Sequence, residues 1–151
     1  MTLFLLVFYQ DYRERQVYWF LFPLIALSCG LLFYNQTLPE LFIVSVLLNG
    51  VFIGLLLLAA FCYSRLVLNI KFNEAFGLGD TLLFISLIFS FSTISFIVLF
   101  VFALVFSLII HLILKSYSAT TTVPLAGYLS LFFGVSYVAL WSGLTNTLYA
   151  I

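Results

Sequence analysis

The sequence predicts an all-α fold, a polytopic transmembrane helical bundle of about six spans, and three observations support it. The chain is 66% hydrophobic and only 7% charged, with a mean hydropathy of +1.31, whereas an ordinary soluble domain is about a quarter charged. Its apolar residues form long runs separated by short charged stretches. At about 20 residues per span, 151 residues suffice for about six crossings in a single domain, 1–151.

The first two helices are expected at about residues 2–12 and 17–34. The first is short, so we expect either that the helix continues past Asp11 with basic side chains reaching outward, or that the bilayer is thin there. It lacks the basic start and the small-residue cleavage site of a signal peptide, and we interpret it as a membrane segment. Pro23 predicts a kink or a late start of the second helix.

A third helix is expected at about 41–63, and the long run 81–114 that follows the next loop contains no Asp, Glu, Lys or Arg. One helix over that run would be about 51 Å long, which exceeds a hydrocarbon core of about 30 Å. The run must therefore fold back, and the Ser/Thr cluster at 90–95 is the predicted turn. This gives helices at about 80–91 and 96–114.

The sixth helix is expected to run to about residue 141, with Pro124 in its first turn. With six spans, the loops after the first, third and fifth helices lie on one side, and the opposite side has only Glu40. An excess of Lys and Arg marks the cytoplasmic face, so both termini are predicted on the non-cytoplasmic side. The basic residues on the predicted cytoplasmic side are Arg13, Arg15, Arg65, Lys71 and Lys115. Net charge is zero, which gives no footprint for nucleic acid.

Asp11 and Asp80 are the only Asp residues, and each lies at the edge of an apolar segment, on the side predicted to be cytoplasmic. Two adjacent carboxylates cannot both ionise cheaply, so they share a proton. The ionised member can take a proton from water while the protonated member polarises a carbonyl, which is aspartic-protease chemistry without a metal or cofactor. Gly77 and Gly79 would let the backbone approach a substrate or adopt a positive φ beside Asp80.

Other interpretations of these residues stay open. Asp80 is placed where a helix N-cap would stand, and Asp11 where a boundary residue would pair with Arg13 or Arg15. The same carboxylates would also suit a small proton-coupled carrier or channel subunit, although no inverted repeat is visible. Cys29 and Cys62 show no metal spacing and are interpreted as small hydrophobic residues, since each lies in a separate apolar run.

Three stretches together resemble a known family. Residues 9–17 read Tyr-Gln-Asp-Tyr-Arg-Glu-Arg-Gln-Val, and residues 76–80 read Phe-Gly-Leu-Gly-Asp. They resemble the two motifs of the type IV prepilin peptidase and preflagellin peptidase family of membrane aspartic proteases, an Asp ending the opening helix before basic residues and a Gly-x-Gly-Asp signature. Residues 123–129, Val-Pro-Leu-Ala-Gly-Tyr-Leu, are similar to the Pro-containing start of the last family helix. The resemblance covers essentially the whole chain.

The resemblance implies that Asp11 and Asp80 are the catalytic pair. The substrate would be a pilin-like precursor, cut at the cytoplasmic face of a prokaryotic membrane just before its hydrophobic N-terminal helix. Longer members have a cysteine-bearing cytoplasmic domain linked to N-methylation, which this sequence lacks, so the resemblance implies a peptidase without methyltransferase activity. The family usually has a Pro shortly after the first basic stretch, where this sequence has Tyr18. It often has a Lys soon after the second Asp, where this sequence has Thr81. A member that has lost activity and serves as an assembly partner is a further alternative.

Overall fold

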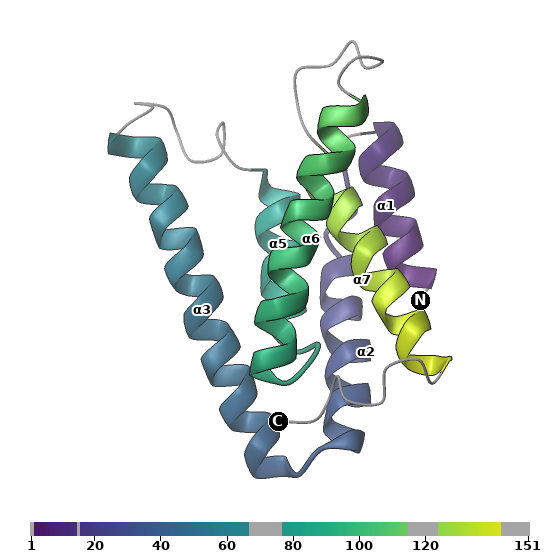
Figure 1. The fold of residues 1–151 in the computed structure, drawn as a ribbon, viewed down its shortest axis with the longest axis vertical. Helices are drawn as coiled ribbons and strands as arrows, with labels where there is room; N and C mark the ends of the chain where they lie inside the picture. Colours follow the sequence, from purple (N-terminus) through teal and green to yellow (C-terminus); the bar gives the residue numbers. More distant parts are fainter. Residues whose placement is uncertain (1, 15, 67–76, 115–123, 143–151) are drawn as a thin grey trace.

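The structure is a computed structural model that describes residues 2–14, 16–66, 77–114 and 124–142. All regular secondary structure in these residues is α-helical, which confirms the predicted all-α class (Figure 1). The helices are α1 (Thr2–Glu14), α2 (Leu21–Gln36), α3 (Pro39–Leu66), α5 (Leu78–Leu87), α6 (Thr93–Leu114) and α7 (Leu125–Trp141).

The predicted helix boundaries hold in outline, and the start of α2 differs for a physical reason. Residues 17–20 are not helical, and α2 begins at Leu21, so Pro23 lies in its first turn. A proline is tolerated there because the N–H that it lacks would have no partner inside the helix. In α1 the helix does continue past Asp11, and it ends at Glu14. Pro124 precedes α7 as its N-cap residue instead of lying in the first turn.

The predicted fold-back between α5 and α6 is present. The first helix of the pair ends at Leu87 and the second begins at Thr93. Asn49, fully buried on α3, donates two hydrogen bonds of 3.0 Å to this turn, one to the carbonyl of Ile88 and one to that of Phe91. These bonds satisfy two carbonyl groups of the segment that joins α5 to α6.

Two of the described helices, α3 and α6, are long and apolar enough to cross a membrane, judged by length and composition. The others are shorter, and α1 and α5 contain 13 and 10 residues, which rise about 20 and 15 Å. The prediction of six full spans, with both chain ends on one side, stays a prediction.

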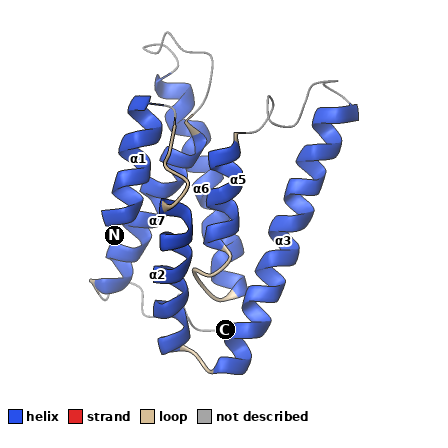
Figure 2. Cartoon of the chain, turned by 180° about the vertical axis from the view of Figure 1, so that it is seen from behind, coloured by secondary structure: helices blue, strands red, loops and turns tan. Residues whose placement is uncertain are grey.

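The core lies mainly between the helices other than α3, which contributes Ile53 to it. The first helix packs mainly on α7, which also packs on α6, while α2 packs on α5. Aromatic rings fill the interior, such as Phe91 against Tyr137 with ring centroids 4.8 Å apart and Phe84 against Phe100 at 4.9 Å. Figures 1 and 2 show α3 along one edge, diverging from α5 toward the end where α5 begins.

One end of the bundle gathers the features on which the functional argument depends. The last turn of α1 and the first turns of α5 and α7 lie toward this end, which is the upper one in Figure 1. Arg13 in the last turn of α1 and Arg65 in the last turn of α3 belong to the same end, whereas Glu40 lies in the first turn of α3 at the other end. Arg15, Lys71 and Lys115 fall outside the described residues.

Candidate functional site: two carboxylates at the start of α7

Asp80 is the third residue of α5, in the turn that the Gly-Leu-Gly-Asp sequence forms. Gly77 is the N-cap residue of this helix, with φ −66° and ψ 141°. Of the two roles considered for this glycine, a positive φ is therefore not observed at Gly77, since this is an extended conformation open to any residue. Its missing side chain matters for space instead, because a Cβ there would lie 3.0 Å from Asp80 Oδ2. At Gly79 a Cβ would meet nothing closer than Phe22 Cζ at 3.9 Å, an ordinary contact.

The Asp80 carboxylate joins two helices. Its Oδ1 accepts a 2.7 Å hydrogen bond from the backbone N–H of Ala126, the second residue of α7. The carboxyl group also accepts from the backbone N–H of Gly77, which is the return bond of a capping box. The N-cap interpretation is therefore partly right: the cap itself is Gly77, and Asp80 supports it while also reaching a separate helix.

Asp11 reaches the same turn of α7 from a third helix, α1. It lies near the end of α1, and its Oδ2 accepts a 2.6 Å hydrogen bond from the backbone N–H of Gly127. Arg13 donates to the hydroxyl of Tyr9, and its guanidinium lies 5.7 Å from the centroid of that ring. The hydrogen bond to Gly127 thus attaches Asp11 to α7.

The structure therefore brings the two predicted acids together on successive main-chain N–H groups. Successive peptide nitrogens lie about 3 Å apart, so the two accepting oxygens can be no more than about 8 Å apart. The carboxyl groups of Asp11 and Asp80 are close enough to interact electrostatically. Both side chains are partly buried.

The donors come from a helix start, where N–H groups have no intrahelical acceptor. The helix dipole adds partial positive charge at the same place, and hydrogen bonds to carboxylates are among the strongest in proteins. Distances of 2.6 and 2.7 Å are at the short end of the N–H···O range. The start of α7 is therefore suited to hold two negative or proton-sharing groups side by side.

Gly127 fits this arrangement by having no side chain. A Cβ at this position would lie 3.1 Å from Asp11 Oδ2 and 3.3 Å from Asp11 Cβ. Residues 126 and 127 are buried beneath the acids. Neither was singled out as a site residue from the sequence; the available signal was a proline followed closely by two small residues at the start of an apolar helix.

The chemistry open to this site is acid–base chemistry. Two carboxyl groups with different hydrogen-bond partners can divide the roles of proton donor and proton acceptor. Within the parts of the chain that the structure describes, no three His, Cys, Asp or Glu side chains group closely enough to hold a metal ion.

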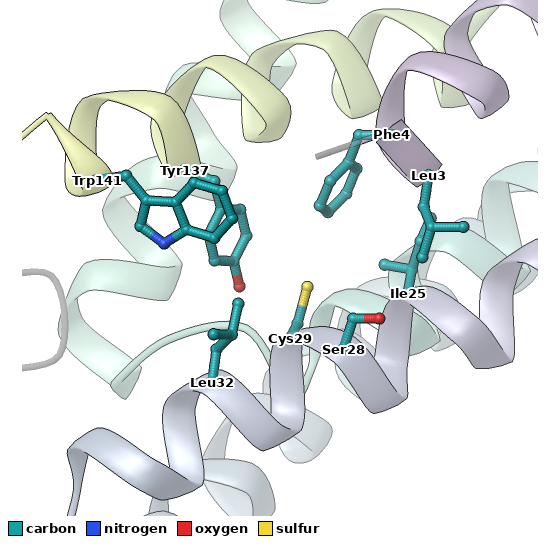
Figure 3. A pocket seen from close by; sticks show the side chains of 8 residues that line it. All are labelled: Leu3, Phe4, Ile25, Ser28, Cys29, Leu32, Tyr137 and Trp141. Carbon is teal, nitrogen blue, oxygen red and sulfur yellow. The ribbon is translucent and has the colours of Figure 1, made fainter.

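A small cavity between α1, α2 and α7 lies away from the acids (Figure 3). Cys29 and Tyr137 point into it, beside Phe4 and Trp141 near the start of α1 and the end of α7. Its volume is about 30 Å³, enough for about one water molecule and far below the roughly 300 Å³ of a small ligand site. This cavity is therefore too small to hold a ligand of ordinary size.

Comparisons of this chain with protein-family models, with curated proteins and with solved structures gave no match.

Proposed function

We propose that this chain is an intramembrane aspartic endopeptidase that removes the leader peptide of type IV pilin-like precursors. The main support is the pairing of Asp11 and Asp80, which are far apart in the sequence and accept hydrogen bonds from successive N–H groups of α7. A purely structural acid needs one helix end to cap. Two acids that converge on one helix start are close enough to interact electrostatically, and such an interaction is a condition for sharing a proton.

In the proposed reaction the two carboxyl groups hold one proton between them. The ionised group accepts a proton from a water molecule as the water oxygen bonds to the scissile carbonyl carbon, and the protonated group donates its proton to the carbonyl oxygen. The tetrahedral intermediate then breaks its C–N bond. The nitrogen leaves as an amine after it has received the proton that the first carboxylate took from water. One hydroxyl of the intermediate gives its proton to the other carboxylate, so the product is a carboxylic acid and the pair again holds one proton. No metal or cofactor takes part.

The proposed membrane arrangement has the six helices as membrane segments, with the acids at the cytoplasmic boundary and both chain ends on the other side. Arg13 and Arg65 at the end that holds the acids, and Glu40 at the opposite end, support this orientation. Short α1 and α5 fit a bilayer that is thin around the site. In a precursor whose leader ends where its apolar helix begins, the cleavage site would lie at the membrane boundary, at the same depth as the two acids.

The proposed family is that of the type IV prepilin and preflagellin peptidases in the prokaryotic cytoplasmic membrane. Its support is that the three stretches carrying the resemblance, 9–17, 76–80 and 123–129, supply the two acids and the N–H groups of one site. The activity proposed is that of a peptidase without N-methyltransferase activity.

The proposal is tested by incubating purified protein with pilin-like precursors of its own host. Asp11→Asn and Asp80→Asn should each lower kcat/KM by at least about 1,000-fold, because an amide can neither accept nor share the proton. Glu14→Gln removes an exposed acid about one turn from Asp11 and should cleave at the wild-type rate. Normal processing by either Asn variant would refute the proposal.

Proton-coupled transport is the alternative that the same preparations test. A carrier would place its acids near mid-depth facing a pore, whereas here both lie toward one end of the bundle. Proton-dependent uptake by proteoliposomes of wild-type protein, without precursor cleavage, would favour transport.

A further inference from the structure

We propose that the first turn of α7 is a third part of the site, in which Gly127 is the positioning residue for Asp11 and the N–H of Ala126 positions Asp80. Its catalytic meaning rests on the proposed peptidase function. The contact itself does not, and it can be tested without any precursor.

The carboxylates need a common support because they repel one another. Two like charges brought together in a partly buried site disfavour each other's ionised form. The N–H groups of residues 126 and 127 point at the acids from one helix start, and the dipole of α7 adds to their effect. The turn therefore offsets the repulsion that would otherwise push the side chains of Asp11 and Asp80 apart.

The same turn sets the distance between the acids. Asp11 and Asp80 lie on separate helices, so neither helix alone determines how far apart their carboxylates stand. Successive N–H groups of a helix have fixed geometry. One carboxylate on each group therefore takes its position from a rigid piece of main chain.

Gly127 makes the close approach of Asp11 possible. Its α-carbon faces the Asp11 side chain so directly that an added Cβ would come within 3.1 Å of Oδ2 and 3.3 Å of Cβ. Asp11 would then have to move by a few tenths of an ångström, which would lengthen its 2.6 Å bond. Small displacements of reacting groups are costly in catalysis.

Gly134 supplies a matched control in the same helix. It lies two turns after Gly127 and also faces α1, where an added Cβ would meet Phe4 Cβ at 3.4 Å. Gly134→Ala therefore tests crowding between α1 and α7 without touching either acid. Thermal unfolding of both variants in detergent shows whether each is folded.

The first test is kinetic. Gly127→Ala should lower kcat for precursor cleavage about tenfold or more while KM stays within about twofold, since it moves an acid and leaves the substrate surface unchanged. Gly134→Ala should change neither by more than about twofold. A wild-type kcat for folded Gly127→Ala would overturn the inference, as would equal losses of kcat in the two variants.

The second test needs no substrate. Asp11→Cys and Glu14→Cys are made separately, each in a background with Cys29→Ala, Cys62→Ala and Asp80→Asn. Each protein then has a single thiol. A thiol at a helix start is held as thiolate, so the alkylation rate of the Asp11→Cys thiol should fall severalfold less between pH 9 and pH 6 than that of the Glu14→Cys thiol. The quantity compared is, for each thiol, the ratio of its alkylation rate at pH 9 to its rate at pH 6. Because each ratio compares one thiol with itself, differences in accessibility between the two thiols cancel.

Adding Gly127→Ala should bring the two ratios together, while adding Gly134→Ala should leave them apart. Equal ratios for the two thiols in the proteins that keep Gly127 would overturn the inference. If the ratios differ as expected but wild-type protein cleaves no precursor, the peptidase proposal fails and the positioning role stands. If wild-type protein cleaves but Gly127→Ala keeps its kcat, the positioning role fails and the peptidase proposal stands.

Discussion

Gly54 and Gly127 both lie inside apolar helices, but their surroundings differ. An added Cβ at Gly127 would meet Asp11, whereas at Gly54 on α3 it would meet nothing within 4 Å. Glycine inside a helix is less favourable than alanine by about 0.5–1 kcal/mol. The same substitution should therefore be harmful to the site at one position and helpful to the fold at the other.

Gly54→Ala should raise the free energy of unfolding by about 0.5–1 kcal/mol, because alanine loses less conformational freedom on folding and finds open space there. Reversible unfolding in detergent micelles measures this change. A loss of stability would contradict the expectation and would mean that another molecule occupies that face of α3.

At this scale the sequence indicates the acids and misses their partners. Asp11 and Asp80 stand out because a carboxylate at the edge of an apolar run is rare and conspicuous. Ala126 and Gly127 do not stand out, because their contribution is a main-chain N–H that every residue except proline possesses. The pattern of side chains does not show which helix start will donate main-chain hydrogen bonds to an acidic residue of another helix.

Among the elements, the α5–α6 hairpin was the most predictable and its attachment to α3 was not. The fold-back follows from length alone, since one helix over 81–114 would be too long for a bilayer. The link to α3 depends on Asn49, whose acceptors Ile88 and Phe91 lie 39 and 42 residues away in the sequence. An asparagine in an apolar run signals a buried hydrogen bond without naming the partner.

Asn49→Leu should destabilise the protein by about 1–3 kcal/mol, because the carbonyls of Ile88 and Phe91 lose a donor and stay buried. Unfolding in detergent measures the loss. Precursor cleavage per folded molecule should be unchanged, since the turn lies at the other end of α5 from Asp80. Val51→Ala, at an exposed position of the same helix, is the control and should change stability little. A stable Asn49→Leu variant would contradict the role given to these bonds.

For the whole molecule, composition predicts the helical bundle but not which helices are neighbours. The first helix packs on the last, and nothing in either sequence specifies this pairing. A soluble helix shows its core face as an apolar stripe, whereas an almost uniformly apolar helix such as α7 shows none. The order of the helices is predictable from the apolar runs and the polar segments between them. Which helices pack on one another is known only from the structure.

Orientation in the membrane is testable at the two ends of α3. Its 28 residues rise about 42 Å, and Glu40 and Arg65 lie near opposite ends. In a background with Cys29→Ala and Cys62→Ala, a membrane-impermeant thiol reagent should label Glu40→Cys in intact cells, and should label Arg65→Cys only after the membrane is permeabilised. Labelling of both variants from the same side would contradict the proposed topology.

The attachment of both acids to α7 has a consequence for biosynthesis. A ribosome releases the segments bearing Asp11 and Asp80 well before the one bearing Ala126 and Gly127, so a nascent chain holds both acids without their anchor. If the chain is the proposed peptidase, we expect its activity to arise only after translation has passed the start of α7, which would spare precursors being inserted nearby from a half-made protease.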